Sequence, residues 1–363
     1  MTPLGEDLRR IIAAEGPITV ERYMALCLGH PVHGYYTTRD PFGTAGDFTT
    51  APEISQMFGE LIGLWTVETW GLMARPGLLR LIELGPGRGT LMQDLLRAAR
   101  VNPGFIGAAQ VHLVETSPAL RDIQRATLAG AAAPVAWHER LSDVPDGPAV
   151  LVANEFFDAL PVRQFQRTER GWCERLVGLG DDGGLAFGLA PEPRSGLPEG
   201  DRPGDVLEWP AAALDLTREL AIRVARHGGA ALVVDYGYEG PAFGDTLQAV
   251  RRHAYADPLA EPGEADLTVH VDFAKLARAA AAAGAAVHGP VAQGAFLRAL
   301  GIETRAAVLK RRTTPEQAQA VDDALARLTG AGEGGMGKLF KAICFADPAL
   351  SPPPGFPAPQ ASS

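Results

Sequence analysis

Three glycines separated by single residues follow an acidic residue at the end of an apolar run. The segment 79–89 ends in Glu-Leu-Gly-Pro-Gly-Arg-Gly, with Glu83 two residues before the first glycine. Gly85, Gly87 and Gly89 can adopt positive φ angles and let a ligand approach the backbone. The helical pattern that follows would place unpaired N–H groups and a partial positive charge beside that ligand. The pattern therefore predicts a strand, a tight turn and a helix that bind a carboxylate or a phosphate.

A second acidic residue indicates which ligand the turn binds. The next apolar run, 110–115, ends in Glu115, about 30 residues after Gly85. At the tip of the second strand this carboxylate could accept hydrogen bonds from both hydroxyls of a ribose. A dinucleotide fingerprint would space its glycines Gly-x-Gly-x-x-Gly. With Glu83 and Glu115 both in register, the spacing favours methyltransferase motif I over a nicotinamide-dependent oxidoreductase or a simple strand-to-helix connection.

A third apolar run ends in an amide and two carboxylates. Asn154, Glu155 and Asp158 follow the predicted strand 149–153, with two phenylalanines between the acids. The carboxyl ends of parallel strands face the ligand crevice, so we expect these side chains to hold a polar cationic group in a desolvated site. The alternative is that Asn154 and Asp158 cap the turn and Glu155 is exposed. The tyrosines of Asp235–Tyr238, after the fifth strand, either line the site or pack in the core.

The sequence gives little support for a metal site or for disulfide bonds. The eight histidines lack the His-x-x-x-His spacing of metal ligands, and the three cysteines are isolated. We therefore predict no catalytic metal, no disulfide framework and a reducing compartment.

Charge and hydropathy narrow the choice of partners and compartment. The chain has 363 residues and a formal net charge of −10, so it lacks the positive field that draws proteins to nucleic acid or acidic membranes. A basic protein segment or a neutral molecule is the easier partner. The N-terminus lacks the apolar region of a secretory signal, and no apolar stretch is long enough to span a bilayer. We expect a cytoplasmic protein.

Strands and helices alternate from residue 80 onward, which is typical of a parallel sheet with right-handed crossovers. A proline- and glycine-rich loop and a helical pattern over 51–70 precede them, and that helix should pack on the sheet. Residues 286–292 and 338–346 would add a closing antiparallel pair. The predicted strands are 80–84, 110–115, 134–137, 149–153 and 230–235, and the predicted helices are 89–99, 117–129 and 211–227.

The predicted domain organisation has three parts. Residues 1–75 form an N-terminal helical region that packs on an α/β domain, 76–347. Within that domain, 162–209 alternates apolar and polar residues around hairpin turn signals, which predicts an antiparallel β-hairpin insertion. This insertion is a candidate substrate-binding element. The proline-rich residues 348–363 are expected to be disordered.

Several strings together resemble one known family. The chain resembles the MidA family of S-adenosylmethionine-dependent methyltransferases. The resemblance covers nearly the whole chain except the tail. The strings at 154–161 and 46–55 are much more specific than motif I, which is generic to methyltransferases. The strings are Gly46–Ser55, Glu83–Gly89, Glu115–Leu120, Asn154–Pro161, Asp235–Tyr238 and Met336–Lys341.

The resemblance implies a fold, a cofactor and a site. The fold would be a class I methyltransferase, an α/β Rossmann-like seven-stranded sheet, and the cofactor S-adenosyl-L-methionine. Mitochondrial members of the family act as assembly factors for respiratory complex I and dimethylate an arginine of a complex subunit. This chain would be a bacterial-type member. The implied cofactor-binding residues are Glu83, Gly85, Pro86, Gly87, Gly89, Glu115, Thr116 and Asn154, with Phe48 and Thr49 of the loop that covers the methionine end.

The implied acceptor is an arginine of a partner protein. A guanidinium is always protonated, yet two carboxylates can hold its fork and take the proton as methyl transfer proceeds. We assign that work to the catalytic residues Glu155 and Asp158, beside Asn154. The alternatives are methylation of a small molecule or another heteroatom, and an assembly chaperone with a structural cofactor pocket. The sequence does not predict the oligomeric state.

Overall fold

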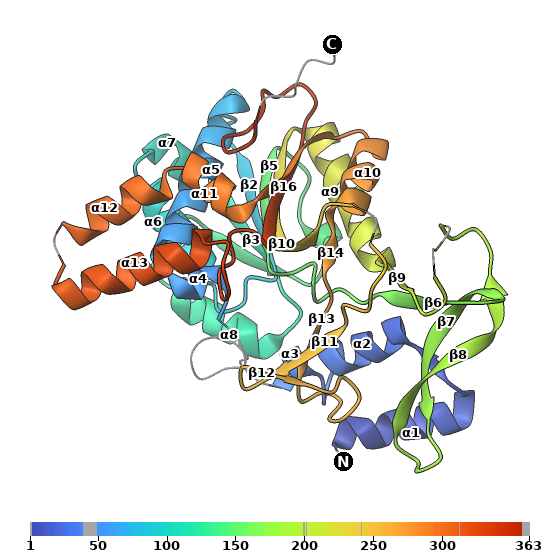
Figure 1. The fold of residues 1–363 in the computed structure, drawn as a ribbon. Coiled ribbons are helices and arrows are strands. Elements are labelled where there is room, and N and C mark those ends of the chain that lie inside the picture. The colour runs from blue at the N-terminus through green and yellow to red at the C-terminus, as the bar shows by residue number, and fades with distance from the viewer. Residues whose placement is uncertain are drawn as a thin grey trace. The chain divides into compact units, whose positions relative to one another are not determined.

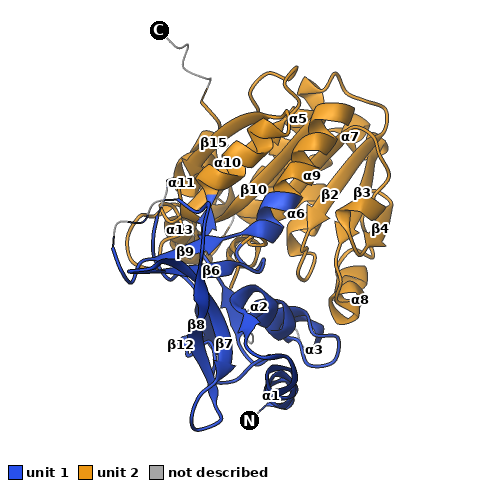
Figure 2. Ribbon diagram, turned by 90° about the vertical axis from the view of Figure 1, so that its right-hand side faces the viewer, with its two compact units in different colours: residues 1–48, 158–215, 240–272 blue, residues 49–157, 216–239, 273–363 orange. Residues whose placement is uncertain are grey.

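The computed structural model divides the chain into two units, each assembled from segments that are distant in the sequence. It describes residues 2–38, 49–198, 200, 202–240, 242–311 and 313–357. Unit 1 contains residues 1–48, 158–215 and 240–272, and unit 2 contains residues 49–157, 216–239 and 273–363 (Figure 2).

Unit 2 is built on a mostly parallel sheet in the strand order β15-β16-β10-β5-β2-β3-β4. β5 pairs in parallel with both β2 and β10, and all six of its residues are buried, which explains its continuous apolar sequence. β16 pairs antiparallel with β10 and β15. The predicted parallel sheet and its closing antiparallel pair are confirmed. The strands are β2 (Leu79–Leu84), β3 (Ala109–Val114), β4 (Val135–His138), β5 (Ala149–Asn154), β10 (Gly229–Tyr238), β15 (Ala286–Ala292) and β16 (Phe340–Ala346).

Helices cover both faces of this sheet (Figure 1). α5, α6 and α11 lie on one face, and α9 and α10 on the other. Leu81, Val150 and Leu232, from three neighbouring strands, pack with Trp65 of α5 in one core cluster. The helices are α4 (Ala51–Ile54), α5 (Gln56–Leu72), α6 (Thr90–Ala99), α7 (Pro103–Ala108), α8 (Pro118–Thr127), the 3-10 helix η1 (Leu141–Asp143), α9 (Ala211–His227, which begins in unit 1), α10 (Phe273–Ala282), α11 (Gln293–Ala299), α12 (Ile302–Lys310) and α13 (Pro315–Thr329).

Unit 1 combines N-terminal helices with antiparallel strands. One sheet has the order β1-β7-β6-β9, with β8 paired to β7, and a second has the order β12-β11-β13. Tyr23 of α2 and Val177 of β7 belong to one buried cluster. The elements are α1 (Pro3–Glu15), β1 (Ile18–Thr19), α2 (Val20–Gly29), α3 (Tyr35–Thr38), β6 (Arg163–Thr168), β7 (Gly171–Leu179), β8 (Leu185–Arg194), β9 (Val206–Trp209), β11 (Gln248–Arg251), β12 (Ala254–Ala256), β13 (Asp266–Thr268) and β14 (Val271–Asp272).

The division differs from the predicted domain boundaries. The antiparallel strands expected over 162–209 are present, but they form a unit with α1 to α3 and with 240–272. α4 and α5, expected in the N-terminal region, belong to unit 2, where Met57, Phe58 and Trp65 are buried in the core cluster of the sheet. The pairing of distant segments through side-chain packing leaves no periodic signal in the sequence.

Residues 348–357 correct the expectation of a disordered tail. The indole N–H of Trp65 donates to the carbonyl of Pro354 at 3.1 Å. Phe356 is 8% exposed, and its ring lies 5.3 Å from that of Phe296, centroid to centroid. Composition does not predict this docking. One buried aromatic side chain is enough to order the segment, because its prolines reduce the conformational entropy that is lost on ordering. Residues 358–363 lie outside the described residues.

The docked segment makes a measurable contribution to stability. Phe356→Ala is expected to lower the free energy of unfolding by about 3 kcal/mol, the cost of deleting a buried phenylalanine ring. Urea denaturation of the variant measures the effect, and a chain that ends after residue 357 is the control that should match the full chain. A variant as stable as the parent would contradict the docking.

Candidate functional site

The glycine turn after β2 has the conformation that the sequence predicts. Gly85, Gly87 and Gly89 have φ angles of 59°, 52° and 83°, all in the left-handed region. The Gly89 N–H donates to the carbonyl of Pro86 at 2.7 Å. Gly89 is also the N-cap of α6, and a glycine brings no side-chain acceptor for the amides of the first helical turn. These amides favour an anionic group at this end of α6.

Gly85 is required for a second reason. A Cβ atom at this position would lie 2.4 Å from Cδ2 of Phe156, which follows β5. The absence of a side chain therefore lets the Phe156 ring approach the turn. This contact joins the tips of β2 and β5.

Glu115 lies at the tip of β3, and donors of the protein hold its carboxylate. It is 8% exposed; Oε1 accepts from the Ser117 N–H at 2.8 Å, and Oε2 accepts from Nε2 of Gln124 at 3.2 Å. Burial raises the pKa of Glu115, and these hydrogen bonds oppose the rise. A carboxylate has about four lone-pair sites, so it can accept further bonds from a ligand. The neighbouring Thr116 is exposed.

Gln124 is a site residue that the sequence analysis missed. Its Nε2 donates to the carbonyl of Gly87 at 2.8 Å as well as to Glu115. The tips of β2 and β3 thus meet at one side-chain amide, as expected for neighbouring parallel strands. A polar residue four positions after the buried Leu120, on the inner face of α8, was the available signal.

Glu155 follows β5 in an unusual backbone conformation. Its φ angle is 49°, a left-handed conformation that is costly for a side chain other than glycine. Oε1 accepts from the Ala51 N–H at the start of α4, at 2.7 Å, and from Nδ2 of Asn154 at 3.2 Å. Oδ1 of Asn154 is buried and has no hydrogen-bond partner among the described residues. Such strain, maintained by specific contacts, is characteristic of functional sites.

Asp235 fixes the segment after β5 from the neighbouring strand. Its Oδ2 accepts from the N–H groups of Phe156 and Phe157 at 3.1 and 2.9 Å, and its Oδ1 accepts from the Tyr236 N–H at 2.9 Å. The Tyr236 ring lies 5.3 Å from that of Phe340, centroid to centroid. Asp235 thus holds the segment after β5 in place, a role that the sequence did not predict.

Asp158 belongs to unit 1, whereas Glu155 belongs to unit 2. Within unit 1, the hydroxyl of Tyr36 donates to Asp266 at 2.9 Å. Burial, followed by the charges of Asp266 and Asp158, raises the pKa of Tyr36. The two acids that the sequence analysis paired are thus divided between the units, and Asp158 lies in the same electrostatic environment as Tyr36 and Asp266.

The segment before α4 is described only in part. Phe48 lies outside the described residues, Thr49 is half-buried, and Thr50 is the N-cap of α4. The hydroxyl of Thr90, the first residue of α6, donates to Glu53 of α4 at 2.5 Å. This contact brings α4 to the N-terminus of α6.

Glu83 carries a buried carboxyl group at the end of β2. It is 2% exposed, and its Oε2 has no hydrogen-bond partner among the described residues. Burial raises the pKa of Glu83 to about 8. In the unliganded protein the carboxyl is therefore protonated at neutral pH, and a cationic ligand group beside it would favour ionisation.

The raised pKa of Glu83 predicts a pH-dependent stability. The folded pKa of about 8 lies above the ordinary value of 4.5, so its contribution is fully present below pH 4.5 and is lost as the pH rises through 8. We expect Glu83→Gln to remove this decline and to be more stable than the parent at pH 8.5. Urea denaturation between pH 5 and 8.5, with the exposed Glu68→Gln as the control, measures it. Parallel pH curves for Glu83→Gln and the parent would contradict the prediction.

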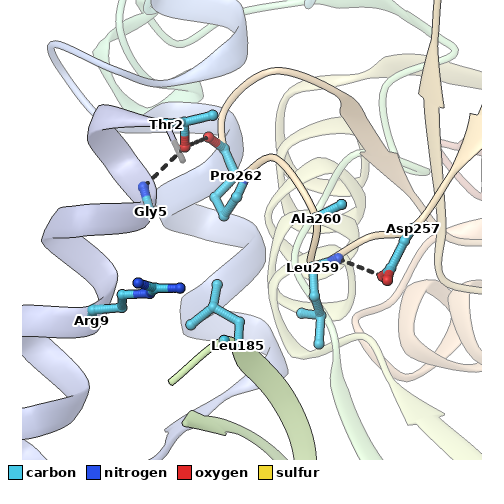
Figure 3. A pocket seen from close by; sticks show the side chains of 9 residues that line it. Thr2, Gly5, Arg9, Leu185, Asp257, Leu259, Ala260 and Pro262 are labelled. Carbon is cyan, nitrogen blue, oxygen red and sulfur yellow. Dashed lines mark hydrogen bonds between the residues drawn. The ribbon is translucent and has the colours of Figure 1, made fainter. Parts of the chain in front are cut away.

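Unit 1 contains a pocket lined by other residues. Its volume is about 200 Å³, and Arg9, Leu185 and Asp257 contribute to its lining (Figure 3). The hydroxyl of Thr2 donates to the carbonyl of Pro262 at 2.8 Å at one side. None of the residues predicted from the sequence lines it.

The part of the chain that the structure describes has neither a cluster of metal ligands nor a helix that could span a membrane. Its histidines, cysteines and acids form no group of three or more that could hold a metal ion. Each helix within the described ranges is too short or too polar to cross a membrane.

Comparisons with known proteins all identify methyltransferases as similar to this chain. Residues 61–291 match the model of a family of S-adenosyl-L-methionine-dependent methyltransferases. Protein arginine methyltransferase NDUFAF7, mitochondrial, of Danio rerio is 40% identical over 330 residues, which cover 84% of this chain and 78% of that protein. The protein of the same name from Homo sapiens is 40% identical, with coverages of 85% and 76%.

A solved structure extends the similarity to the fold. It is a COG1565 superfamily member from Burkholderia thailandensis bound to S-adenosyl-homocysteine. The TM-score is 0.83 at 32% sequence identity, and the match covers 97% of this chain and 93% of that chain. The α/β class expected from the sequence is confirmed.

These relatives correct the expected localisation. The NDUFAF7 proteins are mitochondrial, which contradicts the expectation of a cytoplasmic protein. The expectation depended on isolated cysteines and on a missing secretory signal. These features distinguish reducing from oxidising compartments, and they do not separate the cytoplasm from an organelle matrix.

Proposed function

Because this chain belongs to the family of S-adenosyl-L-methionine-dependent methyltransferases, we propose that it methylates an arginine side chain of a partner protein, in a role similar to respiratory complex I assembly. The observation that carries the choice of arginine is the 40% identity, over 84% of this chain, to a protein arginine methyltransferase. The chain is a methyltransferase, and its cofactor is S-adenosyl-L-methionine. We also propose that it is a bacterial-type member, which the match to the Burkholderia thailandensis protein supports.

The residues at the tips of β2 and β3 fit this cofactor. Glu83 offers a buried carboxyl oxygen that no described residue bonds, which suits a cationic group. We propose that Gly85, Gly87 and Gly89, with Pro86, hold the amino-acid half of the cofactor, and that Glu115 accepts hydrogen bonds from the ribose hydroxyls. Thr116, Asn154, Phe48 and Thr49 complete the proposed set. When bound, the cofactor supplies an electrophilic methyl group on a sulfonium, so the protein's main tasks are alignment and exclusion of water.

The acceptor side of the proposal depends on carboxylates. A guanidinium remains protonated at neutral pH, so a nearby acid must both hold it and take a proton. We propose Glu155 for this step, because its strained backbone at the end of β5 is fixed by contacts to Asn154 and Ala51. We propose Asp158, a buried acid, as the second carboxylate for guanidinium binding. The net charge of −10 is favourable for a basic protein segment.

The experiment supplies purified protein with methyl-labelled S-adenosylmethionine and an extract from cells that lack this gene. The extract is divided into a macromolecular and a small-molecule fraction. The proposal predicts label in the protein fraction, recovered as methylated arginine after hydrolysis and mass spectrometry. Label confined to the small molecules would overturn it in favour of a metabolite methyltransferase. In a third outcome, the parent and a variant that does not bind the cofactor both capture a partner protein, and no label is transferred to it. That outcome would favour an assembly chaperone.

A further inference from the structure

Gln124 is a fully buried amide whose bonds join three parts of unit 2. It lies on α8 and is 0% exposed, and a buried amide without partners is costly. Nε2 donates to the carbonyl of Gly87 at 2.8 Å and to Oε2 of Glu115 at 3.2 Å. Oε1 accepts from the indole N–H of Trp137 at 2.9 Å. The amide thus uses both of its N–H groups and its oxygen.

Trp137 determines which way this amide faces. An indole N–H can only donate, so the atom of Gln124 that meets it must be the oxygen. The NH₂ group is then directed at Gly87 and Glu115. Trp137 lies on β4, and the guanidinium of Arg125 lies over its ring at 5.2 Å, so the indole is itself held in place.

The orientation of Gln124 has a direct effect on Glu115. One carboxylate oxygen is held by the Ser117 N–H at 2.8 Å, and the other is held by Gln124. Two donors from different directions restrict the carboxylate to one orientation. The same NH₂ group holds the carbonyl of Gly87, so it also fixes the glycine turn relative to the carboxylate.

We propose that Gln124, oriented by Trp137, is a positioning residue that aligns Glu115 for recognition of the cofactor ribose and couples it to the glycine turn. The inference rests on the proposed assignment of Glu115 as the ribose ligand. The inference does not depend on which molecule accepts the methyl group. Neither Gln124 nor Trp137 needs to touch the cofactor.

The test measures how strongly binding depends on the ribose hydroxyls. Calorimetry gives the affinities of each variant for S-adenosylhomocysteine and for its 2′-deoxy analogue, and their ratio reports hydroxyl recognition. For the parent we expect a ratio of at least about tenfold, the range for a hydrogen bond to a charged group. Gln124→Met should reduce the ratio to about threefold or less, and Trp137→Phe should reduce it partly, because each removes an alignment bond.

Controls separate positioning from a structural role. Gln93→Met is the matched control: Gln93 is an exposed helical glutamine that donates to the carbonyl of Thr127 at 2.8 Å, and its loss should leave the ratio unchanged. Thermal unfolding confirms that each variant is folded at the temperature of the assay. If Gln124→Met weakens both ligands equally and keeps the parent ratio, the inference is wrong. If Glu115→Gln itself keeps the parent ratio, the ribose assignment is wrong as well, whatever the acceptor of the methyl group.

Discussion

Gly85→Ala will lower the affinity for S-adenosylmethionine by at least about tenfold. The left-handed conformation at this position costs an alanine about 1–2 kcal/mol, and 1.4 kcal/mol corresponds to tenfold in affinity. The added Cβ would also lie 2.4 Å from Cδ2 of Phe156, so either the ring or the turn must move. Calorimetric titration with the cofactor measures the change.

The matched control for this substitution is Gly107→Ala in α7. An alanine Cβ there meets nothing within 4 Å, so cofactor affinity should stay at the parent value. Stability should not fall, because alanine favours a helix more than glycine does. The double variant Gly85→Ala with Phe156→Ala removes the clash and keeps the unfavourable φ angle, so it should recover part of the lost affinity. If Gly85→Ala binds the cofactor as tightly as the parent, the proposed role of the turn is wrong.

Glu155→Gln is expected to reduce turnover by at least about a hundredfold and to change cofactor affinity by less than about threefold, the pattern of a lost general base. Glutamine keeps an oxygen that can accept from the Ala51 N–H, now at 2.7 Å, so α4 should stay in place. The substitution removes only the charge that would hold the guanidinium and take its proton. Single-turnover methylation of the acceptor found by labelling measures the rate.

Two further variants make the test of Glu155 selective. Glu68→Gln removes an exposed carboxylate of α5 and should leave turnover unchanged. Glu155→Ala also removes the acceptor for the Ala51 N–H, so it should lower stability as well as turnover. Full activity of Glu155→Gln, or an equal loss of binding and turnover, would contradict the assignment.

The sequence predicts the sheet, and it predicts which residues lie at the tips of neighbouring strands, because both depend on short-range patterns. Glu83, Gly85 and Glu115 are separated by fixed strand and helix lengths, so their spacing determines that they meet at one edge of a parallel sheet. The structure contains the expected parallel sheet with its antiparallel pair, and the left-handed turn.

The features that the sequence does not predict depend on contacts between distant residues. The bonds of Gln124 to Gly87, and of Asp235 to Phe156, join residues 37 and 79 positions apart. Two other features also depend on contacts between distant residues. They are the docking of Phe356 on Phe296 and the division of Glu155 and Asp158 between units. Periodicity identifies the buried face of an element, and it does not identify the residue that the face meets.

A crystal structure of this protein with S-adenosylhomocysteine bound would show directly whether Glu115 binds the ribose. We expect the carboxylate of Glu115 to accept hydrogen bonds from the ribose hydroxyls while it keeps its bonds to Ser117 and Gln124. We also expect the homocysteine end to lie at the turn Gly85–Gly89. A ribose whose hydroxyls bind elsewhere, with Glu115 bonded only to Ser117 and Gln124, would contradict this expectation.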